Sequence, residues 1–178
     1  DFSDPYFESG IQMAVDKDST IASYADLKGA TVVAKTGSEG LAFAQSIAGT
    51  YGFTVKALAQ ADTMYSEVKA GKAVAVFDDY PVLAYGIKQG NGLKAVTPKE
   101  PAGSYGFGVK KGENAALLAA FNAQLAAMKA DGAYQEILDT YLDAGSSPSS
   151  APTTSGIDPK VQGKTFAIAT DTTFAPFE

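Results

Sequence analysis

Short runs of apolar residues alternate, over the first hundred residues, with longer segments in which apolar residues recur every three or four positions. The short runs are bounded by glycine or polar residues and predict buried strands at residues 31–34, 53–57, 73–77 and 93–96. The longer segments predict helices, one closed near Gly52, one over residues 61–69 and one opened by Pro81. Strands that alternate with helices predict a mostly parallel, doubly wound α/β sheet.

The pattern changes in the last third of the chain. Residues 115–129 and 131–142 predict two helices separated by Asp131 and Gly132. Residues 145–156 carry no charge and no apolar residue larger than Ala, so they are expected to form a flexible linker. Residues 164–170 then gather small and β-branched apolar residues, as a buried strand does, and a polar group follows.

Composition narrows the possible chemistry. The chain has 178 residues, a net charge of −6 and 14 basic residues that are all Lys, so it lacks the basic face that a nucleic-acid partner requires. It contains no His and no Cys, which removes the usual zinc sites, thiol nucleophiles and imidazole acid–base chemistry. No apolar run approaches the roughly 20 residues that span a bilayer.

A polar, glycine-containing loop at residues 35–38 lies between a predicted strand and a predicted helix. Backbone N–H groups near Ser38 and Glu39 could hold an oxygen of a small ligand at the helix N-terminus, with Lys35 adding positive charge. The simpler alternative is that Ser38 only caps the helix. Lys35-Thr36-Gly37 and Ser66-x-x-Lys69 also match two motifs of penicillin-binding enzymes, but in reversed order and without Ser-Asp-Asn.

Two adjacent acids, Asp78 and Asp79, end the third predicted strand. A pair of carboxylates suggests glycoside hydrolysis or metal binding, but neighbouring strand residues point to opposite faces and cannot converge on one substrate. One of the two is therefore expected in a cleft. A solvated strand end is the alternative.

Three stretches together resemble a known family. Ala169-Thr-Asp-Thr-Thr-Phe-Ala-Pro-Phe-Glu178 resembles the first strand and ligand loop of the extracytoplasmic solute-binding proteins of amino-acid ABC transporters, especially their glutamine-binding branch. Residues 1–7 and 105–112 resemble the two hinge strands of the same family. In the family the opening strand precedes the hinge, whereas here it follows. We therefore expect a circular permutant or a fragment of two tandem binding domains.

The resemblance implies a periplasmic-binding-protein-like α/β fold with one complete lobe and an incomplete second lobe. The expected parts are a first hinge strand at 1–5, a complete lobe at 6–104 and a second hinge strand at 105–112. Helices of the other lobe follow at 113–142, then a linker at 143–163 and an opening strand with its ligand loop at 164–178. The expected hinge residues are Asp1, Phe2, Ser3, Asp4, Pro5, Tyr105, Gly106, Phe107, Gly108 and Val109.

The resemblance to this family implies six ligand-binding residues. Lys35 would contact the ligand side chain, Gly37 would let the backbone come close, and Asp79 would bind the α-ammonium group. Phe174 would pack on the aliphatic part of the ligand, although ordinary core packing is the alternative. Ser38 and Asp171 complete the set. Glu39 departs from the branch, which has Gly there, and its carboxylate could repel an acidic ligand or point to water.

The implied function is capture of a polar amino acid between two lobes and delivery to a membrane permease, outside the cytoplasm, with no cofactor, no metal and no catalysis. Glutamine is the first expectation, with glutamate, asparagine or a cationic amino acid open. Two alternatives stay open: a dehydratase-like catalytic relative and a ligand-sensing domain of a membrane receptor or permease. Because the family's α-carboxylate clamp uses an Arg, we expect the isolated chain to bind amino acid weakly or not at all. A strand-swapped dimer or a complementing fragment is a plausible partner.

Overall fold

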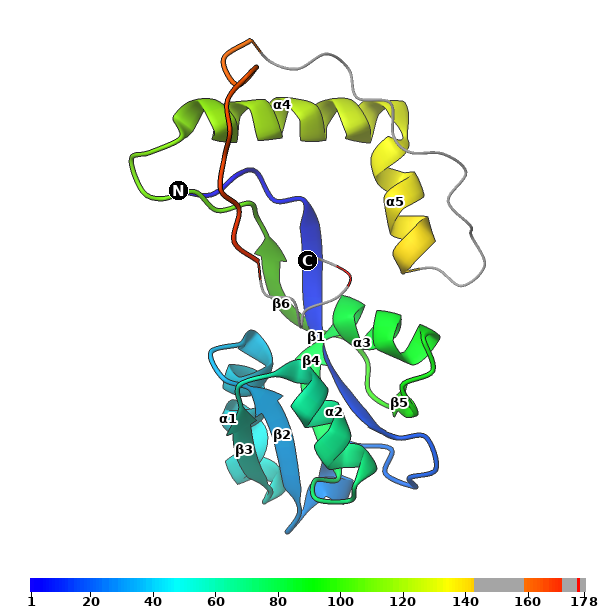
Figure 1. Cartoon of the computed structure of the whole chain (residues 1–178). Coiled ribbons are helices and arrows are strands. Elements are labelled where there is room, and N and C mark those ends of the chain that lie inside the picture. Colours follow the sequence, from blue (N-terminus) through cyan, green and yellow to red (C-terminus); the bar gives the residue numbers. More distant parts are fainter. Residues whose placement is uncertain (143–158, 171–175, 177–178) are drawn as a thin grey trace. The chain divides into compact units, whose positions relative to one another are not determined.

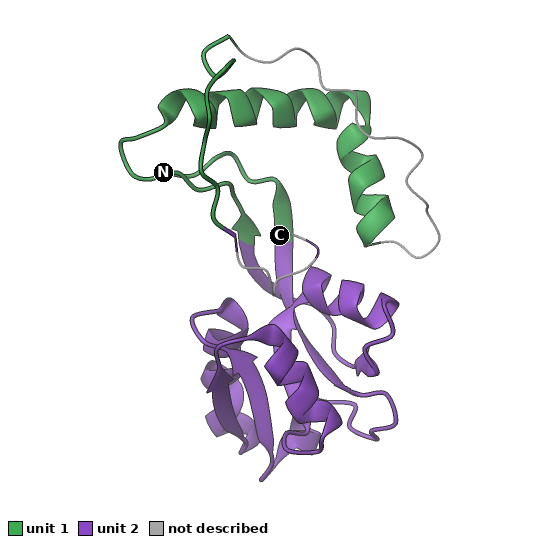
Figure 2. Ribbon diagram, in the orientation of Figure 1, with its two compact units in different colours: residues 1–8, 104–169 green, residues 9–103, 170–178 purple. Residues whose placement is uncertain are grey.

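The computed structural model describes residues 1–142, 159–170 and 176. The chain folds into two compact units (Figure 2). The first unit comprises Asp1–Glu8 and Ser104–Ala169, and the second comprises Ser9–Gly103 and Thr170–Glu178. The chain therefore passes from one unit to the other at residues 8–9, 103–104 and 169–170. Both predicted hinge segments, 1–5 and 105–109, fall within the first unit, and their role as a hinge stays a prediction.

A mixed sheet with strand order β3-β2-β4-β1-β5 organises the second unit, and β6 also pairs with β1 (Figure 1). Strand β2 runs parallel to both β3 and β4, whereas β1 runs antiparallel to β4 and β5. The doubly wound α/β class predicted from the sequence is confirmed, and the antiparallel β1 makes the sheet mixed rather than mostly parallel. The strands are β1 (Phe7–Asp16), β2 (Thr31–Lys35), β3 (Thr54–Leu58), β4 (Ala75–Asp79), β5 (Leu93–Ala95) and β6 (Glu100–Tyr105).

The helices of the second unit begin and end close to their sequence signals. Helix α1 closes on Gly52, whose φ of 71° is the left-handed conformation that glycine adopts at least cost. Helix α3 carries Pro81 in its first turn, where a missing N–H removes no helical hydrogen bond. These elements are η1 (Tyr24–Leu27), α1 (Glu39–Tyr51), α2 (Ala61–Lys69) and α3 (Tyr80–Lys88).

Strand β1 has no counterpart in the sequence prediction, although it pairs with three other strands. Its polar residues and Gly10 interrupt the alternation that marks a strand. Gly10 is needed there because a Cβ atom on it would lie 3.0 Å from the Glu100 carbonyl oxygen. The close approach of the β1 and β6 backbones thus explains why a glycine interrupts the strand pattern at position 10.

Strand β4 differs from its predicted range of 73–77. It begins at Ala75 and extends through Asp78 and Asp79, which pair with Gln12 and Ile11 of β1. Pairing with a distant strand therefore sets its end, and the two acids lie inside the strand rather than after it. Smaller differences of one residue occur in β2, β3 and β5.

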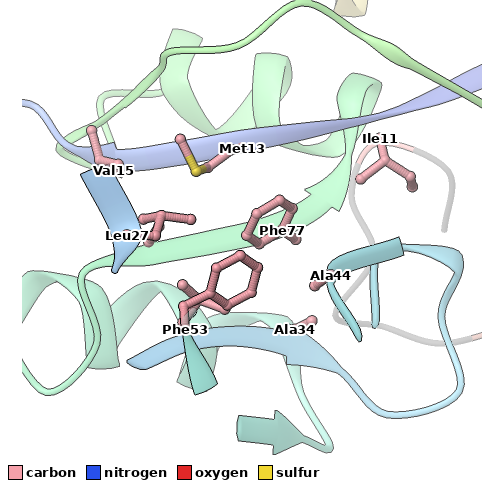
Figure 3. Close-up of a cluster of buried hydrophobic side chains, with 10 residues drawn as sticks. Ile11, Met13, Val15, Leu27, Ala34, Ala44, Phe53 and Phe77 are labelled. Atoms are coloured by element: carbon pink, nitrogen blue, oxygen red, sulfur yellow. The ribbon is translucent and has the colours of Figure 1, made fainter. Parts of the chain in front are cut away.

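The core of the second unit consists of two clusters on opposite faces of the sheet. Val32 and Ala34 of β2 lie in one cluster with Phe77, and Val33 lies in the other with Val76, as side-chain alternation along a strand requires. Helix α1 contributes Ala44 to the first cluster (Figure 3). Helices α2 and α3 contribute Met64 and Leu83, among others, to the second. Each large buried side chain adds about 1.5–3 kcal/mol.

The first unit contains α4 (Ala115–Asp131) and α5 (Ala133–Tyr141), separated by Gly132 with φ of 90°. These are the two predicted helices. Among the residues of these helices, only Leu125 is buried. No helix in the described part of the chain is long and apolar enough to cross a bilayer.

The two predicted hinge segments pair with each other inside the first unit. Ser3 N donates to the Phe107 carbonyl oxygen, and Tyr6 N donates to that of Tyr105, both at 2.9 Å. Only one isolated bridge forms, between Phe2 and Gly108. The prediction of a second hinge strand at 105–112 is wrong in its limits, because the strand β6 ends at Tyr105. Pro5 has no N–H group, so it cannot donate a backbone hydrogen bond to the opposite segment.

The predicted buried strand at 164–170 is not a strand in the structure. Six of its seven residues are exposed, and Ile168 retains 75% of its accessible surface. A strand exists only where a neighbouring strand accepts its backbone hydrogen bonds, and this segment has none among the described residues. The linker residues 143–158 lie outside the described residues.

Candidate functional site

Residues 35–38 connect the carboxyl end of β2 to the N-terminus of α1, in the order that the sequence predicts. The Ser38 hydroxyl accepts a hydrogen bond from Leu41 N (3.1 Å) and donates one to the Lys35 carbonyl oxygen (2.8 Å). Ser38 therefore caps the helix, which is the simpler of the two alternatives for its side chain. A ligand at this loop would have to meet the backbone N–H groups or the Lys35 ammonium group.

Gly37 adopts a φ of 76°. A Cβ atom placed on it would have no atom within 4 Å. The glycine is thus required by the left-handed turn of the loop rather than by close packing within the described chain. Open space above its Cα is compatible with the predicted approach of a ligand, and that role stays a prediction.

The two acids at the end of β4 have different environments, as strand alternation predicts. Asp78 is 1% exposed, whereas Asp79 is partly exposed and occupies the N-cap position of α3. Asp78 Oδ2 accepts a hydrogen bond of 2.7 Å from the Tyr65 hydroxyl of α2, and Oδ1 accepts one of 2.9 Å from Asp79 N. Desolvation raises the pKa of Asp78 to about 6, although both hydrogen bonds and the charge of Lys35 oppose the rise.

Sheet pairing brings the two candidate segments to one edge. Ala34 of β2 pairs with Phe77 of β4, so Lys35 and Asp78 follow on neighbouring strands at their carboxyl ends. The first turn of α1 lies against the same place, because a Cβ atom on Gly40 would lie only 2.9 Å from the Phe77 carbonyl oxygen. Parallel strands of an open α/β sheet commonly bind ligands at this edge.

Glu39 is the first residue of α1, and its carboxylate has a definite partner. Oε2 accepts a hydrogen bond of 2.7 Å from Gly103 N of β6. The side chain is exposed to solvent, as one of the two alternatives from the sequence expects, and one of its oxygens is also anchored on the backbone of another strand.

The remaining predicted ligand residues, Asp171 and Phe174, lie outside the described residues. The structure places Lys35 and Asp79 at the ends of β2 and β4, and Gly37 and Ser38 in the loop that follows β2. The ligand-binding roles of all six residues stay predictions. Thr170, the described residue before them, is exposed.

Tyr65 was not singled out from the sequence, although a signal for it exists. Ala61, Met64 and Val68 form the buried face of α2, and Tyr65 lies on that same helical face. A hydroxyl on an apolar face needs a hydrogen-bond partner, so the pattern predicts a polar side chain in contact with this face. The contact between Glu39 and Gly103 has no local signal, because 64 residues separate the two.

The structure also bears on two alternative kinds of chemistry, acyl transfer by a serine nucleophile and metal binding. The Ser66 hydroxyl donates to the Asp62 carbonyl oxygen one helical turn earlier (2.8 Å), which is typical of a solvated helix residue rather than a nucleophile. In the described part of the chain, no group of three or more acidic, His or Cys residues is arranged to hold a metal ion.

Comparisons with known proteins identify a family for most of the chain. The family described as bacterial extracellular solute-binding proteins, family 3, matches residues 1–144. The ABC transporter glutamine-binding protein GlnH of Bacillus subtilis (strain 168) is 36% identical over 150 residues, which cover 80% of this chain and 51% of that protein. The chain thus spans about half the length of this relative.

Solved structures give the same result. Substrate-binding domain 2 of GlnP from Lactococcus lactis, in an open conformation, matches with a TM-score of 0.62 and 41% identity over 82% of this chain and 63% of that one. An ancestral arginine-binding protein bound to glutamine matches with a TM-score of 0.68 and 36% identity, covering 80% of this chain and 64% of that one.

Proposed function

This chain belongs to family 3 of the bacterial extracellular solute-binding proteins, and from that premise we propose that it is part of a binding domain that captures a polar amino acid for an ABC transporter. Glutamine is the first candidate ligand. The proposal is supported by the names of the relatives and by one observation in particular. Lys35 and Asp79 end two adjacent parallel strands beside the N-terminus of α1, so a cation, an anion and a helix N-terminus occur at one sheet edge.

Each group has a proposed role that follows from its chemistry. The Asp79 carboxylate binds the α-ammonium group of the amino acid through a charge-assisted hydrogen bond. Lys35 and the backbone amides of the loop around Gly37 and Ser38 bind oxygen atoms of the ligand side chain. Asp171 and Phe174, outside the described residues, supply a second carboxylate and an aromatic surface for the aliphatic part of the ligand.

We propose that the ligand is bound and released without chemical change. Specificity then comes from pairing each charged end of the ligand, and no general acid or base is required. The segments at 1–5 and 105–109 act as the hinge, and the closed form is presented to a membrane permease outside the cytoplasm. The description of the family as extracellular supports this location.

The chain is proposed to be a permuted or tandem-domain part of a longer binding protein, so the binding test uses the full-length protein that contains it. Isothermal titration calorimetry with glutamine, glutamate, asparagine and arginine measures the ligand preference. Lys35→Met and Asp79→Asn are each expected to weaken glutamine binding by about 10- to 100-fold, as loss of a charged hydrogen bond requires. Lys72→Met and Asp62→Asn, which remove the same charges elsewhere in the second unit, serve as controls.

Unchanged glutamine affinity in both Lys35→Met and Asp79→Asn would contradict the proposed site. Absence of binding for all four amino acids in the wild-type protein would contradict the proposed function. Incubation of the protein with its ligand, followed by NMR of the small molecule, tests whether any conversion occurs. We expect the ligand spectrum to stay unchanged.

A further inference from the structure

Glu39 places a fixed carboxylate beside the proposed ligand loop. Its Oε2 accepts from Gly103 N at 2.7 Å. A Cβ atom on Gly103 would lie 2.8 Å from Glu39 Oε1, so the carboxylate rests directly on the Gly103 backbone. A charge-assisted bond of this length holds the side chain in one place, although it is exposed to solvent.

No cation neutralises this carboxylate within the described residues. Lys17–Asp18, Lys56–Glu67 and Lys110–Glu113 are ion pairs among these residues, whereas the partner of Glu39 is the Gly103 amide. A carboxylate offers about four lone-pair sites, and Gly103 uses one of them. Glu39 can therefore accept further hydrogen bonds from a ligand.

The position of Glu39 relative to the proposed ligand groups follows from the backbone. It directly follows Ser38, the last residue of the loop. The next residue, Gly40, lies against Phe77 and Asp78, since a Cβ atom on it would be 3.4 Å from Asp78 Cα. Glu39 thus borders both the loop that begins at Lys35 and the strand end that carries Asp79.

Two opposing electrostatic effects act on a ligand side chain at this place. The N-terminus of α1 attracts negative charge with the equivalent of roughly half a positive charge. The Glu39 carboxylate repels negative charge with a full unit, and the repulsion strengthens when a ligand displaces water. Lys35, at the start of the same loop, adds a full positive charge that the Glu39 carboxylate offsets. The loop therefore attracts a ligand carboxylate less strongly than Lys35 and the helix end would without Glu39.

We infer that Glu39 determines the charge class of the ligand. It accepts a hydrogen bond from a ligand side chain that ends in a donor, such as the amide of glutamine or a cationic group. It disfavours amino acids whose side chain ends in a carboxylate, such as glutamate. This inference rests on the proposed function, because it names the substrate class of the same site.

The test compares Glu39→Gln with the wild type in the full-length protein. Gln keeps an oxygen that can accept from Gly103 N and removes only the charge, so the fold is expected to be kept, and thermal unfolding checks this. Calorimetry with glutamine, arginine and glutamate gives the affinity ratios. Glu67→Gln removes the same charge from α2 in the same unit and is the matched control.

We expect the wild type to bind glutamine at least about tenfold more tightly than glutamate, and Glu39→Gln to reduce this preference by about tenfold, which corresponds to about 1.4 kcal/mol. The arginine affinity should fall in the same variant, and both effects should shrink at high salt. Glu67→Gln should change neither the preference for glutamine over glutamate nor the arginine affinity.

A glutamine-to-glutamate ratio that is the same in Glu39→Gln and in the wild type overturns the inference while leaving the proposed function intact. Failure of the wild type to bind any of the three amino acids overturns the proposed function and the inference with it.

Discussion

The Tyr65 hydroxyl donates a hydrogen bond of 2.7 Å to Oδ2 of Asp78, and this contact joins α2 to the end of β4. Among the described residues, Asp78 is the buried charged side chain of the core, with 1% of its surface exposed. Its other oxygen accepts from Asp79 N, so the buried carboxylate also fixes the backbone of the proposed ligand-binding acid. Burial and the neighbouring Asp78 raise the pKa of Tyr65, which therefore stays a donor across the physiological range.

The pKa of Asp78 makes stability depend on pH. The carboxyl has a pKa of about 6 in the folded chain and 3.8 as its ordinary value, so the folded state binds a proton more tightly than the unfolded state. This contribution is complete below pH 3.8 and is lost as the pH rises through 6. The difference corresponds to about 3 kcal/mol.

Asp78→Asn should remove this dependence. We expect urea unfolding at pH 4, 5, 6 and 7 to show that the wild type loses stability relative to the variant as the pH rises. Asp62→Asn, at the start of α2, should keep the wild-type slope. If the free energy of unfolding changed with pH in the same way in the wild type and in Asp78→Asn, the pH dependence could not be assigned to Asp78.

Tyr65→Phe leaves the Asp78 carboxylate buried with one donor fewer. The expected cost at pH 7 is about 1–3 kcal/mol, the usual penalty for an unsatisfied buried polar group. The cost should be smaller at pH 4, where Asp78 is protonated. Tyr51→Phe is the control, because the Tyr51 hydroxyl makes no hydrogen bond to the described residues; equal costs for the two variants would show that the Tyr65–Asp78 bond is not stabilising.

Two glycines of α1 differ sharply in what surrounds them. Gly40→Ala places a Cβ atom 2.9 Å from the Phe77 carbonyl oxygen and should destabilise the chain by about 1–3 kcal/mol. Gly49→Ala meets no atom within 4 Å and should stabilise it by about 0.5–1 kcal/mol through helix propensity. Chemical denaturation measures both, and a similar effect of the two substitutions would mean that α1 does not pack closely on β4.

The 178-residue chain alone should bind glutamine more weakly than micromolar. It spans about half of its B. subtilis relative and contains no Arg to clamp an α-carboxylate. Calorimetry of the purified chain checks this expectation. A micromolar heat of binding with no second polypeptide present would contradict it.

A strand-swapped dimer remains a proposal for residues 164–170. Ile168 is 75% exposed in the single chain, so pairing of this segment with another copy would bury it. We expect a dimeric mass in solution that Ile168→Lys converts to a monomeric mass. Light scattering measures this, with Lys160→Ala as a surface control. A monomeric wild-type chain would exclude the exchange.

The sequence predicted most of the local structure because side-chain periodicity is a local property. Helix α2 matches its predicted range at both ends, and Gly52 and Pro81 mark helix limits where their backbone preferences require. The alternation of β2 and β4 between two core clusters also follows from the order of residues alone. The class of fold, the family and the loop at Lys35 were therefore accessible without coordinates.

Tertiary structure determined what depends on distant partners. Strand β1 is defined by its pairing with β4, β5 and β6, and residues 164–170 form no strand because no described strand pairs with them. The unequal environments of Asp78 and Asp79 come from burial of Asp78 beside Tyr65, and Glu39 is anchored by an amide 64 residues away. Strand pairing, burial and the charge environment depend on residues that are close in space but far apart in the sequence. The order of residues alone therefore could not specify them.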